Sequence, residues 1–321
     1  MSESSCTIVI VSPVYNDWDS ASLLCRALDE VWASALDCVV HVVLVDDGSA
    51  KRLDGWQAFA PRALRSIRML PLVANIGHQR AIAAGLCHVQ ETLPCNFVIV
   101  MDADGEDRPE DTLTLAMRAR AEPATVVFAV RRKRFERGTF RVGYFLYRLI
   151  HRALTGVSVR VGNFSALPAS ALPRLTVASG IWSHYAGAVF RSKLALGMVA
   201  LDRGRRYHGR SHMSVVSLVI HGLAGIASFQ DVVATRLLLG SVLSASVAGV
   251  CLVAVALVRF STQMAIPGWA TYVTGFLVTI ILVMIASSFN LVFTLIAARG
   301  QTQLVPIRDY RAFVGAEERL S

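Results

Sequence analysis

Apolar runs alternate with stretches of helical length through the front of the chain. Each run is rich in β-branched residues and bounded by polar or turn-forming ones, which is typical of strands buried on both faces of a parallel sheet. Helices are expected between the runs. We predict strands over Thr7–Ser12, Cys38–Val45, Ile67–Leu72, Phe97–Met101 and Thr125–Val130. This alternation predicts an α/β fold with a doubly wound, mostly parallel sheet.

Carboxylates follow three of these strands. Asp17 comes after the first, Asp46 and Asp47 after the second, and Asp102 and Asp104 after the fourth. Ligands of open α/β sheets bind at the carboxyl ends of strands, and an acidic edge there suits a metal-bound nucleotide diphosphate. No Gly-x-Gly-x-x-Gly follows the first strand, which argues against a dinucleotide-binding domain. For Asp46 and Asp47, capping of a tight DDGS turn remains an alternative.

The segment after the fourth strand carries the strongest chemical signal. Asp102, Asp104 and Glu106 occupy alternate positions, and close carboxylates repel unless a cation lies between them. Oxygen ligands favour a hard divalent ion, so we predict a site for Mg²⁺ or Mn²⁺. A solvated acidic turn is the alternative. Pro109 is expected to open a helix, with Asp107 as its N-cap.

Two uncharged stretches near the end of the chain are long enough to cross a membrane. Leu237–Val258 and Ala270–Ala298 both exceed a hydrocarbon core of about 30 Å at about 1.5 Å per residue. We therefore predict two spanning helices. The second is longer than required, so we expect it to tilt or to break near Ser287, Ser288 and Asn290.

The charge pattern around these stretches predicts a topology. The loop Phe260–Trp269 contains no Lys or Arg, whereas arginines flank the outer ends of both stretches, and Met1–Cys6 is short and polar without a signal peptide. We expect an integral protein of the plasma or inner membrane with its front domain and both termini cytoplasmic. The predicted parts are a front domain (1–213), a juxtamembrane amphipathic helix (214–236), a transmembrane hairpin (237–298, spans about 237–258 and 270–298) and a cytoplasmic tail (299–321).

Composition and charge indicate the partners. The chain has 321 residues, 54% hydrophobic, and a net charge of +9 that arises from basic clusters over 131–152 and 203–210. Beside two membrane spans these clusters indicate lipid phosphates, and we expect no nucleic acid partner. The stretch Arg141–Leu154 shows helical apolar spacing, which leaves a core-facing helix and an interfacial helix both open. A homo-oligomer also remains open.

Four motifs together carry a family resemblance. In order along the chain they are PVYND, LVDDGS, NIGHQRAIAAG and MDADGEDRPE. The chain resembles the inverting family 2 glycosyltransferases of the GT-A fold. An R-x-x-G-x-S segment at Arg206 and the C-terminal hairpin make it similar to the polyprenyl-phosphate glycosyltransferases, the group of dolichyl-phosphate mannose synthase and the bactoprenol glucosyltransferases. The resemblance implies transfer of a sugar from a nucleotide-sugar to undecaprenyl or dolichyl phosphate at the cytoplasmic face.

The resemblance also implies roles for individual residues. The nucleotide-sugar would lie against Pro13, Tyr15, Asp17, Asp46, Asp47 and Asp102. The metal would bind Asp102, Asp104 and Glu106, the last at a position where the family more often has Gln. The acceptor phosphate would bind Arg131, Arg206 and Ser211, and the catalytic set would be Asp104, Arg131 and Arg206.

The acceptor decides whether a general base is needed. A lipid phosphate is already largely ionised, because the second pKa of a phosphate monoester is about 6, so a basic clamp suffices. A hydroxyl acceptor would need a base, for which Asp104, Asp107, His78 and His184 are candidates. We interpret both histidines as packed or hydrogen-bonded helix residues. A transferase acting on a glycolipid or polysaccharide hydroxyl, and a non-catalytic membrane scaffold of the same fold, remain alternatives.

Overall fold

The chain forms two compact units in a computed structural model. The structure describes residues 6–34, 37–50, 53–131, 147, 149–156, 161–208, 222–261, 268–300 and 303–321. The first unit contains the described residues of 6–131, 161–228 and 303–321, and the second contains those of 147–156 and 229–300.

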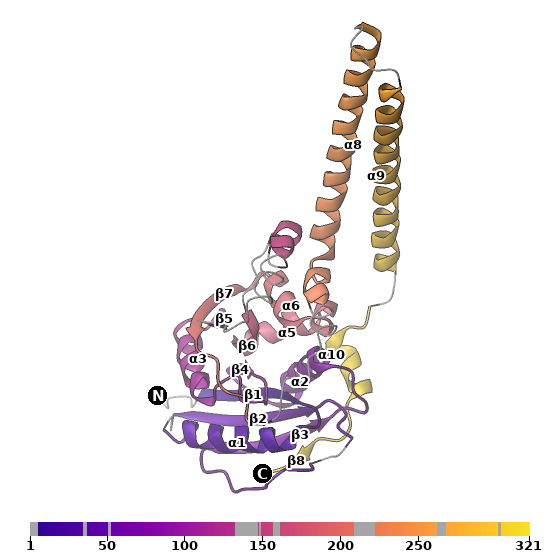
Figure 1. Cartoon of the computed structure of the whole chain (residues 1–321). Helices are drawn as coiled ribbons and strands as arrows, with labels where there is room; N and C mark the ends of the chain where they lie inside the picture. Colours follow the sequence, from indigo (N-terminus) through magenta and orange to yellow (C-terminus); the bar gives the residue numbers. More distant parts are fainter. Residues whose placement is uncertain are drawn as a thin grey trace. The chain divides into compact units, whose positions relative to one another are not determined.

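An eight-stranded mixed sheet forms the centre of the first unit, with the order β7-β5-β6-β4-β1-β2-β3-β8 (Figure 1). Neighbouring strands from β4 to β3 run parallel, β6 is antiparallel to β4 and β5, and β7 runs parallel to β5. The predicted mostly parallel, doubly wound sheet is therefore confirmed. The strands are β1 (Cys6–Val14), β2 (Cys38–Asp46), β3 (Leu64–Pro71), β4 (Phe97–Val100), β5 (Thr125–Arg131), β6 (Val161–Pro168), β7 (Ala195–Leu201) and β8 (Glu318–Arg319).

Helices cover both faces of this sheet because its central strands are apolar on both sides. Ile8 and Ile10 pack with α1 and α3, whereas Val9 and Val11 pack with α2, α5 and α6, and all four side chains are fully buried. This division follows from the period of two along a strand. The helices are α1 (Trp18–Trp32), α2 (His78–Thr92), α3 (Pro109–Ala121), α5 (Leu172–Thr176), α6 (Tyr185–Arg191) and α10 (Pro306–Asp309), with short 3-10 turns at Ala169–Ala171, Ser179–Trp182 and Tyr310–Phe313.

Residues 303–321, which the sequence assigns to a separate tail, return to the first unit. β8 pairs antiparallel with β3, and Val314 forms a further bridge with Leu72. The Phe313 ring meets Trp182 edge to face, with 5.7 Å between the ring centroids. We call residues 303–321 the return segment. It covers one edge of the sheet and contributes to the core on the α2 face.

The second unit is built on two long helices, α8 (Gln230–Ser261) and α9 (Trp269–Gly300), which pack against each other (Figure 1). Both are long and apolar enough to cross a membrane, with a hydropathy of 2.4 in their most apolar windows. Of the two outcomes expected for the long second span, tilt or a break near Ser287, Ser288 and Asn290, the break does not occur, because α9 is continuous. The Ser288 hydroxyl donates to the Met284 carbonyl at 2.8 Å, which satisfies this polar group inside the helix.

α8 begins earlier than the predicted span, at Gln230, so residues 230–236 belong to that helix; residues 214–221 lie outside the described chain. Asp231 in the first turn favours a helix start there. The Arg236 guanidinium donates to the Ala153 carbonyl at 2.7 Å. It thereby caps a short helix over 149–155, which overlaps the end of the predicted amphipathic stretch Arg141–Leu154 and in which Leu149 is exposed.

Candidate active site

The ends of three neighbouring strands form the centre of the site. β1 lies between β4 and β2, with Val11 opposite Val100 and Val14 opposite Asp46. Because all three strands are parallel, the segments that follow them emerge at the same edge of the sheet. The PVYND loop, the DDGS turn and the acidic segment therefore lie at the same edge, as the sequence predicted, and the structure shows that their strands are adjacent.

The DDGS turn is fastened by both of its aspartates. The Asp46 carboxylate accepts from the Ser49 amide at 2.9 Å, and the Asp47 carboxylate accepts from the amides of Ile76 and Gly77 at 2.8 and 3.1 Å. Gly48 is required directly after the two aspartates, since its φ is 69° and a Cβ there would lie 2.4 Å from the Ala74 carbonyl carbon. The capping alternative is thus observed for both side chains, and a contact between Asp47 and the base remains a prediction.

The PVYND loop lies against this turn through a residue that the sequence analysis missed. The Asn16 amide donates to the Ser49 hydroxyl at 2.8 Å, and the Asn16 side-chain oxygen accepts from the Ala50 amide at 2.9 Å. Asn16 has a φ of 51°, a conformation that Asn tolerates better than most residues. Pro13 is buried in β1, and Tyr15 is 52% exposed. Asp17 stands at the N-cap position of α1 without a capping side-chain bond.

The acidic loop, Asp102–Arg108, connects β4 to α3. The Asp107 carboxylate accepts from the Asp102 amide at 3.0 Å, and the Asp104 carboxylate accepts from the Glu106 amide at 2.9 Å. The prediction of Asp107 as the N-cap of α3 is wrong, because Arg108 occupies that position and Asp107 closes the loop instead. Pro109 begins the helix as predicted.

Each predicted metal ligand has a cationic or potentially cationic partner. Asp102 lies 3.2 Å from the His78 imidazole, and Asp104 lies 2.5 Å from the Arg206 guanidinium. Glu106 pairs with Arg203 and lies 3.7 Å from Arg206. In the described part of the chain, no three acidic, His or Cys side chains are grouped as a ready metal site.

The chemistry of the loop nevertheless fits a hard divalent cation. Burial raises the pKa of Asp104, and the neighbouring carboxylates of Asp102 and Glu106 add to the rise despite the Glu106 amide and Arg206. Burial and the two neighbouring carboxylates thus disfavour the ionised form of Asp104 even with the arginine present. Carboxylate oxygens are the donors that Mg²⁺ and Mn²⁺ prefer.

A series of hydrogen-bonded polar side chains connects the acidic loop to α2, β6 and α6. His78, the first residue of α2, contacts Asn163 on β6 at 3.0 Å, and the Gln79 side chain reaches the same Asn163 at 3.2 Å. Gln79 also accepts from the Tyr185 amide at 2.6 Å. His78 is thus hydrogen-bonded at a helix start, as interpreted from the sequence. His184 is similar, since its Nδ1 accepts from the Gly187 amide and caps α6.

Of the predicted acceptor-phosphate residues, the structure places one side chain at the site. Arg206 contacts the acidic loop through Asp104. Arg131 ends β5 opposite Leu201, but its side chain lies outside the described part of the structure, as does Ser211. The roles of Arg131 and Ser211 therefore stay predictions.

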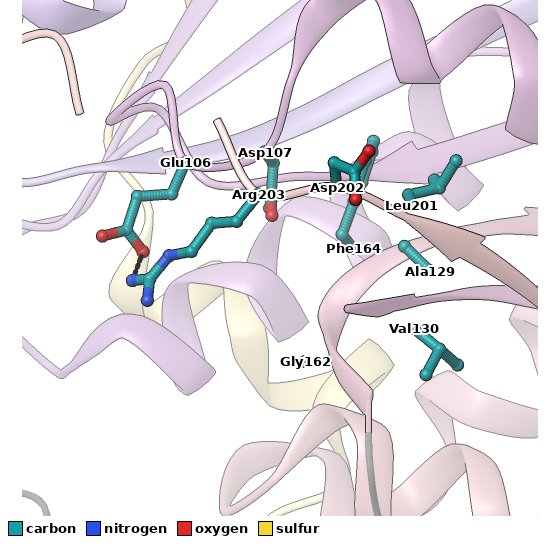
Figure 2. Close-up of a pocket in the computed structure, with 9 residues that line it drawn as sticks. All are labelled: Glu106, Asp107, Ala129, Val130, Gly162, Phe164, Leu201, Asp202 and Arg203. Atoms are coloured by element: carbon teal, nitrogen blue, oxygen red, sulfur yellow. Dashed lines mark hydrogen bonds and ion pairs between the residues drawn. The ribbon is translucent and has the colours of Figure 1, made fainter. Parts of the chain in front are cut away.

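A hollow lies beside the acidic loop at the ends of β5 and β7 (Figure 2). In Figure 2 the Arg203 side chain extends from the segment after β7 to the Glu106 carboxylate. Its lining combines apolar side chains, such as Phe164 and Ala129, with charged ones. Its lining residues are Glu106, Asp107, Ala129, Val130, Gly162, Phe164, Leu201, Asp202 and Arg203.

The sheet and the acidic loop at its carboxyl edge define an α/β domain of the GT-A type. The family model described as glycosyl transferase family 2 matches residues 9–175, more than half of the chain. The chain therefore belongs to glycosyl transferase family 2, and the resemblance stated from its motifs is confirmed.

The chain is similar to individual relatives and to solved structures. The chain is 26% identical over 240 residues to the uncharacterized glycosyltransferase YkoT of Bacillus subtilis, covering 71% of this chain and 69% of the relative. It is 34% identical over 128 residues to the undecaprenyl-phosphate 4-deoxy-4-formamido-L-arabinose transferase of Klebsiella pneumoniae, covering 40% and 37%. Glucosyl-3-phosphoglycerate synthase from Mycobacterium tuberculosis, solved with Mn²⁺, UDP-glucose and phosphoglyceric acid, is similar at 16% identity with a TM-score of 0.48, covering 72% of this chain and 81% of that one.

Proposed function

We propose that this family 2 glycosyltransferase moves one sugar, with inversion, from a nucleotide-sugar to a polyprenyl phosphate at the cytoplasmic face of the membrane. The observation that carries the proposal is the contact between Arg206 and Asp104. It joins the segment expected to hold the acceptor phosphate to the loop expected to hold the donor diphosphate. The two candidate spans and the Klebsiella relative, which is named for undecaprenyl phosphate, support a lipid acceptor.

The acidic loop would hold the metal and the donor. Asp102 and Asp104 are the residues that would bind Mg²⁺ or Mn²⁺, which supplies charge neutralisation for the departing nucleotide diphosphate. The chain's own contribution is a loop already shaped by the Asp107 and Asp104 hydrogen bonds to its backbone. A preshaped loop costs little reorganisation when charge develops.

Arg206 would then orient the acceptor. Its guanidinium can grip a phosphate through two parallel N–H donors, which fixes the direction as well as the charge of the nucleophile. An ionised phosphate oxygen needs no general base. This agrees with the site, where the His78 imidazole lies between Asn163 and Asp102 and the His184 imidazole caps α6.

The test is a transfer assay with the full-length protein in lipid nanodiscs. A panel of nucleotide-sugars is supplied with undecaprenyl phosphate and Mg²⁺, and extracted lipids are read by mass spectrometry. We expect one sugar linked to the lipid phosphate, and about a hundredfold less of this product with Asp104→Asn. Sugar attached only to a hydroxyl of an added glycolipid would favour the second type of acceptor. If the protein consumes none of the nucleotide-sugars, the result would favour a non-catalytic scaffold.

A further inference from the structure

The segment after β7 is docked on the acidic loop. We call Asp202–His208 the arginine segment. The Gly204 amide donates to the Glu106 carbonyl and the Tyr207 amide to the Asp104 carbonyl, both at 2.9 Å. Two backbone bonds from one short segment to one loop fix their relative position. The acidic loop is therefore covered by a segment that lies about a hundred residues further along the chain.

Glycines make this close approach feasible. A Cβ on Gly204 would lie 2.2 Å from the Gly105 carbonyl oxygen. A Cβ on Gly105, whose φ is 86°, would lie 2.8 Å from the Tyr207 ring. Both separations are shorter than van der Waals contact allows. The two segments thus carry small residues where their backbones meet.

Charge is matched across the same contact. Arg203 pairs with Glu106, and Arg206 pairs with Asp104 at 2.5 Å while its Nε lies 3.7 Å from Glu106. The Asp104 and Glu106 side chains are only 18% and 17% exposed, so these pairs are screened less than surface pairs. Arg205, between the two, is exposed and has no hydrogen bond or ion pair to the described residues.

We propose that the arginine segment is a closed clasp whose guanidinium groups stand in for the divalent cation. Arg206 neutralises Asp104 until a divalent cation takes that carboxylate, and the released guanidinium becomes available to the acceptor phosphate. Glu106 anchors Arg203 and is not a metal ligand. This inference rests on the proposed function, and it implies an ordered reaction in which metal and donor bind before the acceptor.

The assignment of Glu106 follows from its partners. Its carboxylate has one arginine at each side, and a cation bound there would have to displace both. Asp104 has only Arg206 as an ionic partner among the described residues. The cation therefore meets less competition at Asp104. Glu106 adds a negative charge to the loop, and its ion pair with Arg203 neutralises that charge.

Mn²⁺ binding in the absence of nucleotide and lipid tests the clasp. Free Mn²⁺ is measured by electron paramagnetic resonance during titration of the full-length protein in detergent, and the binding lost in Asp104→Asn defines this site. Arg206→Gln removes the competing guanidinium, so we expect Mn²⁺ to bind about fivefold tighter, equivalent to about 1 kcal/mol. Arg205→Gln removes the same charge from a residue without an ion pair to the described residues and should change the affinity less than twofold. Equal or weaker binding in Arg206→Gln than in Arg205→Gln would overturn the proposal.

A second variant tests the anchor. Glu106→Gln should leave Mn²⁺ binding within about twofold, while the amides of Gly204 and Tyr207 exchange with deuterium faster because the segment loosens. If Glu106→Gln instead loses Mn²⁺ as fully as Asp104→Asn does, Glu106 is a ligand and the assignment fails. Neither measurement involves sugar or lipid. A failed transfer assay and a failed clasp can therefore be told apart.

Discussion

The Tyr310 hydroxyl donates a hydrogen bond to the Glu91 carboxylate at 2.5 Å, although 219 positions separate the two residues. Tyr310 is 3% exposed, and Arg311 holds the same carboxylate at 2.7 Å. The bond ties the return segment to the last turns of α2. The other end of α2 carries His78 beside Asp102, so one helix spans from the return segment to the site.

Tyr310→Phe should lower the free energy of unfolding by about 1 kcal/mol, because Glu91 keeps its arginine but loses one hydrogen bond. Tyr310→Ala should cost about 3 kcal/mol or more, since it also empties a buried ring site. Thermal or urea unfolding of the full-length protein in detergent measures both. Tyr272→Phe, at an exposed tyrosine of α9, is the matched control and should be neutral. An equally small change in Tyr310→Ala would show that the return segment is not fastened here.

Asp47→Ala should destabilise the first unit by about 2 kcal/mol, because the Ile76 and Gly77 amides lose their acceptor. A role in nucleotide binding alone predicts lower donor affinity without a change in stability. Unfolding by urea, followed by tryptophan fluorescence, distinguishes the two. Glu30→Ala, an exposed change on α1, supplies the baseline.

Asp104→Asn should reduce transfer by about a hundredfold or more while the protein remains folded, since one charged ligand is lost near the departing diphosphate. EDTA should abolish transfer by the unchanged protein. Glu110→Gln, with a 60% exposed carboxylate on α3, should keep nearly full activity. Undiminished turnover in EDTA would contradict the metal prediction.

The pH dependence of metal binding should follow the protonation of Asp104. The pKa of Asp104 is raised by burial and by its carboxylate neighbours, and only the ionised form binds a cation. Protons should therefore displace Mn²⁺ at a higher pH than they would from an ordinary aspartate. Mn²⁺ titrations at a series of pH values check this direction. No loss of affinity until the pH reaches the ordinary range of aspartate would argue against it.

Arg206→Lys should weaken the use of lipid phosphate more than the binding of nucleotide. Lysine keeps the charge but cannot reproduce a two-pronged grip on phosphate, so we expect about a tenfold loss in kcat/KM for the acceptor. Kinetics with varied undecaprenyl phosphate measure it, and Arg205→Lys is the control. If both variants behave alike, Arg206 acts only as a surface charge.

The sequence predicted those parts whose signal is local. The five strands it named all occur, because buried β-branched runs such as Ile8–Val11 can only be satisfied inside a sheet. β6 was missed because VGNFSALP mixes Gly, Asn and Pro into a short apolar run. β8 was missed because Glu318 and Arg319 are exposed charges that pair through their backbone alone.

The candidate site likewise contains residues that the local sequence predicts and contacts that it does not. Asp102 and Asp104 are found from their spacing after a strand, but the partner of each carboxylate is not encoded nearby. Arg203 reaches Glu106 across 97 positions, and nothing in its local sequence distinguishes it from Arg205. Asp107 is a residue type that commonly caps helices, yet its carboxylate instead accepts a hydrogen bond from the Asp102 amide within the loop. Such choices depend on how distant segments meet.

The pairing of the return segment with β3 also sets an order of events during synthesis. Arg68 and Glu317, which form an ion pair at 3.0 Å, are made 249 positions apart, and both long apolar helices are translated between them. Until residues 303–321 leave the ribosome, β3 presents an open edge to any other strand nearby. A nascent chain arrested after α9 would therefore contain the whole hairpin but an unfinished sheet. Such a chain would expose an unpaired strand edge, which favours aggregation until the return segment covers it.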